Sequence, residues 1–447
     1  MKRSPRSTSE IAEAPTGFAR LRWLGPGLLW MVSATGSGEL LFTPRVGALY
    51  GYTLVWALIV AVSLKWFVNR EIGRFAVCTG TDLLTGILTL DRAGRWAVVV
   101  IVVPQLFVAV ATIAGLGGSA ATALVLALPG ATGVWAVVGV ALSTVIVVRG
   151  GYRGVEKVAT VIALALGIAS VAAAISVGPD IAALGSGLVP ALPAQVDAGE
   201  VLPWLGFMLS GAAGMIWYSY WIVAKGYGRR ETEPTRPRDT FDVDDVETIR
   251  LRGWLRQMTI DNSVAVVGTL IITLAFLILG TELLRPEGLL PEEDEIAETL
   301  GRLLGDVWGR AGFWFMVLAL FVGFWDTVLS DQDGFGRMFS TAARPVVDRL
   351  PMLRRWNEQR LRRAIVIVVL AVIPLLLYFA VGEPVVLLAL AGIVEAAHIP
   401  VVAVLTLRLN KRHLPRGLQP TPWAVAGTVT AAAFFAAFTV FYVVRLL

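Results

Sequence analysis

Two short stretches rich in small residues lie inside long apolar runs of this sequence. The first is TGSGE, residues 35–39, which ends in Glu39, and the second is SGAAGM, residues 210–215, which ends in Met215. Glycine tolerates non-helical backbone, and a helix interrupted within a bilayer leaves peptide groups that only protein or a wet cavity can satisfy. A carboxylate, a thioether and freed backbone carbonyls together suit a transition-metal cation. The two stretches therefore predict a cation site at mid-membrane.

The same residues permit two other interpretations. Successive N–H groups in a GSG turn form a nest that binds anions, and the positive end of the half-helix that follows would strengthen it. TGSGELLFTP also resembles the GSGIF turn with which amino-acid transporters hold a substrate carboxylate. The third interpretation is close packing of helices through small residues, for which GAAG alone is typical. We carry the cation as the first hypothesis and a carboxylate or amino-acid substrate as the alternative.

Several ionisable residues fall inside apolar runs, where charges are rare unless they face a cavity or a partner. Glu395 and His398 are three residues apart, so they share one face of a helix. This pair could relay protons, or it could form a static hydrogen bond between helices. Asp326 is a further candidate for proton coupling. It could pair with Lys65, unless Lys65 extends its ammonium group to the cytosolic interface.

Other residues receive simpler interpretations. Asp331 is expected at the inner mouth, Asp261 as an N-cap at the start of a span, and Arg45 at the outer vestibule, where it would repel cations. Trp217 follows the second interruption and is expected to plug or line the cavity. Cys78 is the single cysteine, which excludes an intramolecular disulfide and a Cys-based zinc or iron–sulfur site.

The elements that must position these residues are membrane-spanning helices. Of 447 residues, 56% are apolar and only 16% charged, with a mean hydropathy of +0.72, whereas a soluble protein carries about a quarter of its residues as charges. Apolar runs of about 18 residues or more recur, each long enough to cross a hydrocarbon core of roughly 30 Å. An all-α polytopic membrane protein is predicted, with eleven spans at 23–43, 48–69, 96–120, 131–148, 155–178, 200–224, 258–280, 309–330, 363–381, 384–407 and 422–444.

The distribution of basic residues predicts the orientation. With the N-terminus in the cytosol, the great majority of the 38 Lys and Arg residues fall in inside segments, as the positive-inside rule requires. The net charge of +5 is therefore a topology signal, and no nucleic-acid partner is expected. Residues 1–22 lack the apolar core of a signal peptide and are read as a cytosolic tail. The C-terminus would lie outside, in a bacterial-type inner (plasma) membrane.

The two interruptions stand in the first and the sixth predicted spans. Because five is odd, spans 1–5 and 6–10 would have opposite orientations, and matching interruptions in the leading helix of two inverted halves indicate the midplane site of a secondary transporter. The predicted domains are the tail (1–22), the first repeat (23–178), the second repeat (179–407) and a loop with a peripheral eleventh helix (408–447).

Several motifs are similar to those of the Nramp family of proton-coupled divalent-metal transporters, in which helix 1 reads roughly GPGFL…DPGN…GAxYGY…LLW and the next segment RLGxVTGxDL. The corresponding stretches here are GPGLL (Gly25–Leu29), GSGE (Gly36–Glu39), GALYGYTLVW (Gly47–Trp56), REIGRFAVCTGTDL (Arg70–Leu83), YRGVEKV (Tyr152–Val158) and GLVPALP (Gly187–Pro193). The resemblance covers most of the chain. It implies a LeuT-type fold of the APC superfamily, with a 5+5 inverted repeat and with helices 1 and 6 unwound at the midplane.

The resemblance also implies which residues hold the substrate. In the family, the Asp and Asn of DPGN in helix 1, with a Met and a backbone carbonyl in helix 6, bind the metal. Here Gly36 stands at the Asp position and Glu39 at the Asn position, while Met215 and Ala212 match the Met and the carbonyl donor. Trp217 replaces a proton-linked His. The implied substrate-binding residues are Thr35, Gly36, Ser37, Gly38, Glu39, Gly211, Ala212, Met215 and Trp217.

These observations predict a secondary active transporter that carries a divalent metal of the Mn²⁺/Fe²⁺ class, coupled to protons by alternating access. The sequence contains no Walker motif, and its two histidines supply no nucleophile–base–orienter set, so neither an ATP-driven pump nor an enzyme is expected. The expected partners are an ion or small-molecule substrate and the lipid bilayer. No cofactor is expected beyond the transported metal, and the chain is expected to act as a monomer.

Overall fold

The fold is described from a computed structural model of the chain, which covers residues 11–150, 152–193, 195–230, 245–351 and 355–446. Over these residues every regular element is a helix, and no strand is present. Nine helical stretches within them are long and apolar enough to cross a membrane. The prediction of an all-α polytopic membrane protein is confirmed. Residues 1–10 of the predicted tail lie outside the described part of the chain.

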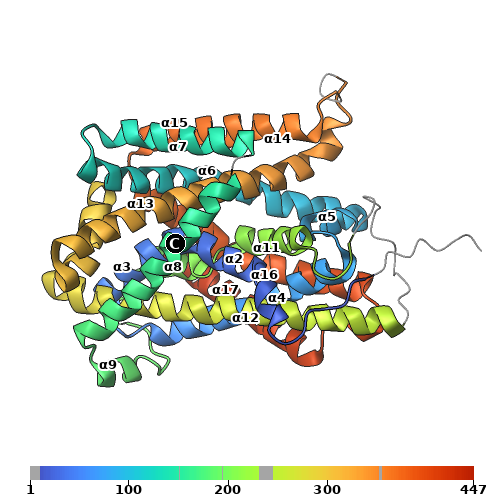
Figure 1. Cartoon of the computed structure of the whole chain (residues 1–447), viewed down its shortest axis with the longest axis horizontal. Coiled ribbons are helices and arrows are strands. Elements are labelled where there is room, and N and C mark those ends of the chain that lie inside the picture. The colour runs from blue at the N-terminus through green and yellow to red at the C-terminus, as the bar shows by residue number, and fades with distance from the viewer. Residues whose placement is uncertain (1–10, 151, 194, 231–244, 352–354, 447) are drawn as a thin grey trace, which may run out of the picture.

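Figure 1 shows how the helices follow one another along the chain. The elements of the first part are α1 (Ala19–Arg22), α2 (Pro26–Ala34), the π-helix η1 (Thr35–Phe42), α3 (Thr43–Tyr50), α4 (Val55–Thr79), α5 (Leu83–Leu88), α6 (Asp91–Ala127), α7 (Thr132–Arg149), α8 (Tyr152–Val177) and α9 (Ile181–Ser186). The elements of the second part are α10 (Ala198–Phe207), α11 (Ala212–Lys225), α12 (Asp245–Leu279), η2 (Gly280–Leu284), η3 (Arg285–Glu287), η4 (Glu293–Glu295), α13 (Ile296–Val347), α14 (Glu358–Ile367), η5 (Val368–Val372), α15 (Ile373–Val381), α16 (Pro384–His413), η6 (Arg416–Leu418) and α17 (Pro422–Leu446). Each of the eleven predicted spans overlaps at least one of these helices.

The helices are layered around the sixth predicted span. In Figure 1, α7, α14 and α15 lie along the upper edge, α6 and α13 pass beneath them, and α4 and α12 lie toward the lower edge. The apolar part of the stretch Gly199–Lys225, which contains α10 and α11, is 94% buried, whereas that of Thr132–Arg149 is only 22% buried. The sixth span is therefore central, and α7 presents most of its surface to lipid.

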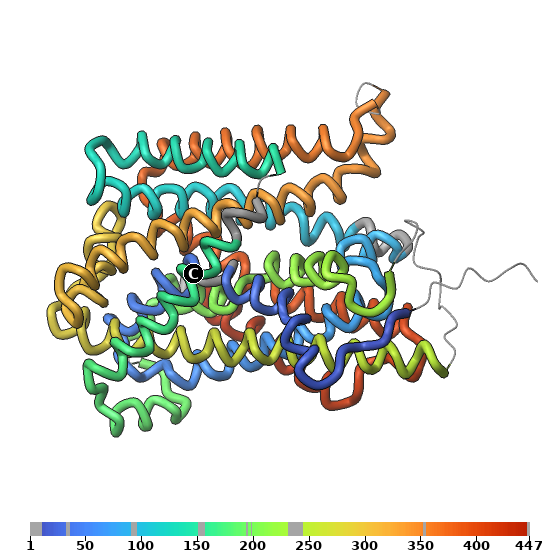
Figure 2. The backbone as a smooth tube through the Cα atoms, viewed as in Figure 1, coloured from blue at the N-terminus to red at the C-terminus, as the bar shows by residue number. Residues whose placement is uncertain are grey.

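Local sequence signals explain where several helices begin and end. The side chain of Asp82 accepts a hydrogen bond from the Thr85 N–H at 2.9 Å and so caps the start of α5. Gly80 and Gly226 end α4 and α11 in the left-handed region, with φ of 73° and 78°. Gly309 has φ of 67° within α13, so this long element is two helices joined at a kink (Figure 2). The kink coincides with the predicted start of the eighth span.

Helix 1 is not unwound at TGSGE, and this prediction is corrected. Residues Thr35–Phe42 form a π-helix that continues α2 into α3. A π-helix widens the turn but keeps its peptide groups in i→i+5 hydrogen bonds. The glycines allow close packing: a Cβ on Gly36 would lie 2.4 Å from Thr327 Oγ1, and one on Gly38 would lie 2.8 Å from the backbone of Phe207. Close packing, one of the interpretations above, thus accounts for both glycines.

Helix 6 is broken, as predicted. α10 ends at Phe207 and α11 begins at Ala212, and between them Leu209 and Ser210 have φ of 52° and 70°. A left-handed conformation in a non-glycine residue is strained and persists only where the surroundings impose it. The break lies slightly before the predicted stretch, and it frees backbone carbonyls at the centre of the molecule. The boundaries predicted for the two repeats stay a prediction.

Candidate functional site

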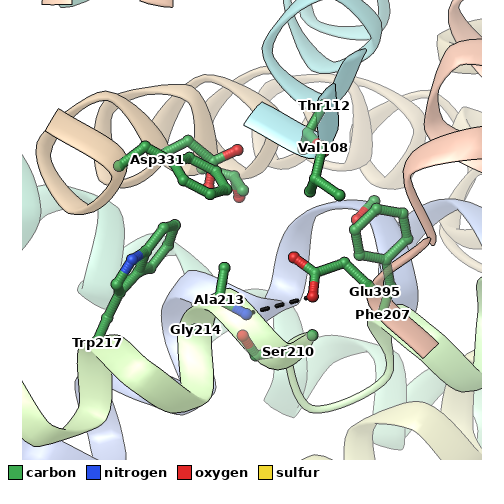
Figure 3. Close-up of a pocket in the computed structure, with 13 residues that line it drawn as sticks. Val108, Thr112, Phe207, Ser210, Ala213, Gly214, Trp217, Asp331 and Glu395 are labelled. Carbon is green, nitrogen blue, oxygen red and sulfur yellow. Dashed lines mark hydrogen bonds between the residues drawn. The ribbon is translucent and has the colours of Figure 1, made fainter. Parts of the chain in front are cut away.

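A cavity of about 40 Å³ lies beside the break of helix 6. Its wall is built by η1, α6, the break itself, α11, α13 and α16 (Figure 3). This volume is sufficient for an ion with one or two waters. The polar side chains of the wall come from Ser37, Thr112, Ser210, Thr327, Asp331 and Glu395, and none of its described side chains is a Lys or Arg. The cavity is therefore acidic.

Glu395, on α16, enters the cavity next to the start of α11. One of its oxygens, Oε2, accepts a hydrogen bond from the Ala213 N–H at 3.2 Å (Figure 3). The same oxygen accepts a second hydrogen bond from Gln105 Nε2, also at 3.2 Å. The start of a helix carries a positive partial charge, so the carboxylate stabilises the second half of helix 6. A Cβ on Gly211 would lie 2.4 Å from Glu395 Cδ, which explains the glycine at this position.

His398 joins the same cluster through a third residue. Its Nδ1 lies 3.1 Å from Gln105 Nε2, so Gln105 bridges His398 and Glu395, and all three side chains are buried. The predicted pair shares one helix face. The sequence reasoning missed Gln105, because its helix, α6, lies far from α16 in sequence and Gln105 follows Pro104 inside an apolar run.

Asp331, on α13, supplies a second carboxylate to the cavity. Figure 3 shows it across the cavity from Glu395. Its side chain is 5% exposed, and its Oδ2 is buried without a hydrogen-bond partner among the described residues. Thr112 Oγ1 and Trp217 Nε1 are also buried without a hydrogen-bond partner among the described residues. The expectation that Asp331 lies at the inner mouth is corrected, because one turn before it Thr327 already packs against helix 1 at the centre.

The implied metal set is placed differently from these carboxylates. Glu39 is buried and its Oε1 accepts from the Leu209 N–H at 2.8 Å, while its Oε2 has no hydrogen-bond partner among the described residues. Met215 and Ala212 are fully buried. The wall of the cavity as described does not include Glu39, Met215, Ala212 or Gly36. Their contact with a substrate stays a prediction.

Some of the remaining predicted substrate residues line the cavity, whereas others pack against neighbouring helices. Ser37, Gly211 and Trp217 line the cavity. The Trp217 ring packs edge-on against Phe335 with 4.8 Å between centroids, and thereby closes one side of the cavity. Gly38 contacts the helix-6 break. Thr35 begins η1, and its side chain lies outside the described part of the chain.

Asp326 and Lys65 do not pair in the way predicted. Asp326 lines a second, smaller cavity of about 10 Å³ between α2, η1, α8 and α13, apart from Glu395. Lys65 is fully buried and donates to three backbone carbonyls of the helix-6 break. Both interpretations of Lys65, as a partner of Asp326 and as a residue that reaches the interface, are therefore wrong. The strong negative field of freed carbonyls holds the ammonium group inside.

Two further charged residues also differ from expectation. Asp261 lies in the middle of α12 and accepts from the Gly25 and Gly27 N–H groups at 2.9 and 2.5 Å, so it caps α2 rather than its own helix. Arg45 is 4% exposed and forms two hydrogen bonds with Glu200, at 3.0 and 2.5 Å; it also donates to the Pro291 carbonyl. The carboxylate of Glu200 neutralises Arg45, which removes the expected repulsion of cations.

Comparisons with known proteins show the family of this chain. Residues 27–445 match the family described as natural resistance-associated macrophage protein-like, Nramp. The chain belongs to the Nramp family. Among curated relatives of this Nramp chain, the uncharacterized protein PM0681 of Pasteurella multocida is 27% identical over 425 residues, which is 89% of this chain and 87% of that protein. The divalent metal cation transporter MntH of Deinococcus radiodurans is 26% identical over 243 residues, 54% of each chain.

Solved structures show the same fold. A manganese transporter of Eremococcus coleocola, crystallised with an aromatic bis-isothiourea compound, has a TM-score of 0.69 at 15% identity and covers 98% of this Nramp chain and 90% of its own. MhsT in complex with L-phenylalanine has a TM-score of 0.54 at 16% identity, with 98% and 100% of the two chains covered. The chain is thus a multi-pass membrane protein with an all-α LeuT-type fold.

The donors around the cavity limit what it can bind. Among the described residues, no three His, Cys, Asp or Glu side chains are placed together to hold a metal ion. The cavity offers two carboxylates, hydroxyl groups and the backbone of the helix-6 break. This is an all-oxygen set, which is typical of sites for hard cations.

Proposed function

We propose that the chain is a secondary active transporter of divalent metal cations, with the cation bound in the cavity beside the helix-6 break. The observation that carries the proposal is the pair of buried carboxylates, Asp331 and Glu395, in one cavity whose described wall contains no basic side chain. Two buried negative charges are costly unless protons or a cation neutralise them, and a divalent cation does so in full. The names of the D. radiodurans and E. coleocola relatives support metal as the cargo.

Mn²⁺ is the leading substrate of this proposal. Oxygen donors suit Mn²⁺ as well as Mg²⁺ and Ca²⁺, and a thioether would be needed to favour softer metals. Because Met215 does not line the cavity as described, we expect weaker discrimination against Mg²⁺ and Ca²⁺ than a thioether-containing site would give. Fe²⁺ belongs to the same predicted class and is the second transition metal to test.

A carboxylate or amino-acid substrate is disfavoured because side chains of the protein already occupy the starts of the half-helices, where such a substrate would bind. The start of α11 already binds the carboxylate of Glu395, and the start of α2 that of Asp261. The N–H groups of GSG belong to a π-helix instead of an open nest. An anionic substrate would also meet Asp331 without a basic partner in the wall. These contacts support a cation as the cargo.

Proton coupling and orientation complete the proposal. Glu395 and His398, which are joined through the amide of Gln105, supply two titratable groups beside the cavity that would gain and lose protons during transport, while Gln105 orients them. The pair of Arg45 and Glu200 closes the side of the molecule that the positive-inside rule assigns to the exterior. We place the N-terminus in the cytosol, the C-terminus outside and the chain, as a monomer, in a bacterial-type plasma membrane. Transport would proceed by alternating access.

The test uses the full chain reconstituted in liposomes that contain a metal-quenched dye. Wild type is expected to take up Mn²⁺, and Asp331→Asn and Glu395→Gln are each expected to reduce uptake at least about tenfold, because each removes a charged ligand. Asp348→Asn is the matched control, since Asp348 is exposed beyond the end of α13. Absence of Mn²⁺, Fe²⁺ and Mg²⁺ uptake in wild type, together with thermal stabilisation by amino acids, would favour the alternative substrate.

A further inference from the structure

The side chain of Lys65 is enclosed by main-chain oxygens at the end of the first half of helix 6. Lys65 lies on α4, is fully buried, and its Nζ donates to the carbonyl oxygens of Gly206, Met208 and Ser210 at 2.7, 2.5 and 2.8 Å. These carbonyls belong to the last turn of α10 and to the break. The end of a helix carries a negative partial charge, so the cradle attracts a cation.

The number of acceptors matches the three N–H donors of an ammonium ion. A neutral amine has two N–H donors, whereas –NH₃⁺ has three, and three carbonyls are bound here. Phe435 of α17 covers the ammonium group from another side, with 5.5 Å between Nζ and the ring centroid, a cation–π geometry. Among the ion pairs of the described residues none involves Lys65. Its direct contacts are therefore with backbone carbonyls, while the carboxylates of Glu39 and Glu395 act on it from a greater distance.

Glu39 holds the same break from helix 1. Its carboxylate accepts from the N–H of Leu209, which lies between two of the carbonyls that bind Lys65. The strained left-handed conformation of Leu209 and Ser210 is thus held by an ammonium group on the oxygens and a carboxylate on a nitrogen. Without the ammonium group, three carbonyls would remain in an enclosed site with no donor.

Freed carbonyls at the ends of broken helices bind inorganic coupling cations in many secondary transporters. We propose that the Lys65 ammonium is a tethered cation in a monovalent-cation site formed by the carbonyls of Gly206, Met208 and Ser210. The site takes a primary ammonium group best, because the three oxygens match its three N–H donors. Lys65 is therefore a positioning residue: its ammonium group takes the place of a free ion and stabilises the break of helix 6. The inference does not depend on the identity of the cargo.

Lys65→Ala tests the proposal by emptying the site. The purified full-length variant is heated in a buffer free of Na⁺, K⁺ and ammonium, with tryptophan fluorescence as the readout, and n-propylammonium chloride is then titrated. We expect a lower unfolding temperature than wild type and a saturable recovery with n-propylammonium, with Na⁺ giving less recovery. Wild type and the control Lys411→Ala, at an exposed cytosolic-end lysine of α16, should not respond. A folded Lys65→Ala protein that no cation stabilises beyond the shift of wild type would overturn the proposal.

If Lys65→Ala does not fold, a second pair of variants tests whether the Lys65 ammonium is a tethered cation. Lys65→Arg keeps a cation with several N–H donors, whereas Lys65→Met keeps length and removes the charge. Lys65→Arg should be recovered in higher folded yield and with a higher unfolding temperature than Lys65→Met. In liposomes, Lys65→Met should reduce Mn²⁺ uptake about tenfold or more, since charged hydrogen bonds are lost. Equal or better yield and stability of Lys65→Met would refute the tethered cation, whatever the cargo is.

Discussion

At the scale of single residues, one close contact explains why position 36 holds no acidic side chain. A side chain at position 36 has no room, because its Cβ would lie 2.4 Å from Thr327 Oγ1. Gly36 stands at the position that matches the metal-binding Asp of the Nramp family. Asp331 lies one helical turn beyond Thr327 on α13 and lines the cavity. In the proposed site, the acidic side chains come from α13 and α16.

The contact between Gly36 and Thr327 makes a prediction about stability. Gly36→Ala should lower the free energy of unfolding by about 1–3 kcal/mol, the usual cost of overpacking. Thr327→Ala removes the nearest oxygen, so the double variant should recover most of this loss. Thermal unfolding of the four proteins in detergent provides the comparison. Equal losses in both backgrounds would mean that the two residues do not compete for the same space.

Met215 gives a prediction that separates packing from metal binding. Met215→Leu keeps the volume but removes the thioether, and such exchanges cost less than about 1.5 kcal/mol in a core. Because Met215 is fully buried and does not line the described cavity, Mn²⁺ uptake should stay within about twofold of wild type. Uptake is measured in the same liposomes with Cd²⁺ as a second metal. A selective loss of Cd²⁺ uptake would show that the thioether reaches the cargo during transport.

At the scale of helices, the ends of the half-helices are held by side chains of opposite charge. The carboxylate of Asp261 binds the start of α2, the ammonium of Lys65 binds the end of α10, and the carboxylate of Glu395 binds the start of α11. Each charge meets the pole of a helix dipole that attracts it. These contacts fix the helices beside the cavity through side chains of the protein alone.

The cap on α2 leads to a graded prediction. Asp261→Asn keeps an oxygen for the Gly25 and Gly27 N–H groups but loses the charge, whereas Asp261→Ala leaves both donors unpaired. We expect losses of about 0.5–1 kcal/mol for Asn and about 1–2 kcal/mol for Ala, as for helix caps in general. Chemical unfolding monitored by tryptophan fluorescence measures both. Identical stability of the two variants and wild type would show that the cap contributes nothing.

At the scale of the whole molecule, a buried ion pair joins helices that must separate if the site is to open on that side. Arg45 on α3 binds Glu200 on α10 and the carbonyl of Pro291, which follows η3. This contact ties the second half of helix 1 to the first half of helix 6. In the proposed orientation this contact lies on the outer side of the molecule.

The pair of Arg45 and Glu200 predicts non-additive variants. Removing one partner leaves the other charge buried and unpaired, which typically costs about 3–5 kcal/mol, whereas apolar replacement of both is far less harmful. Arg45→Met and Glu200→Met should each lower the unfolding temperature more than the double variant does. Thermal unfolding completes the double-mutant cycle, and metal uptake from the outer side provides a functional readout. Additive losses would exclude a coupled pair.

Much of the architecture could be predicted, because hydropathy and the SGAAGM stretch report on single segments, whereas TGSGE wrongly predicted an unwound helix 1. The broken helix 6, the eleven spans and the family all follow from local pattern. The partners of buried charges do not. Lys65 binds oxygens 141–145 residues away, and the donors to Asp261 lie 234 and 236 residues before it. Periodicity shows that such residues share a helix face, but it contains no information on which helix lies opposite, so Asp331 was misplaced.

The tight fit between Gly36 and Thr327 has a consequence for how this chain can change through time. An acidic side chain cannot be accommodated at position 36 while Thr327 fills the space, so a smaller residue at 327 would have to come first. Any stepwise exchange of both residues is therefore restricted to one order by sterics.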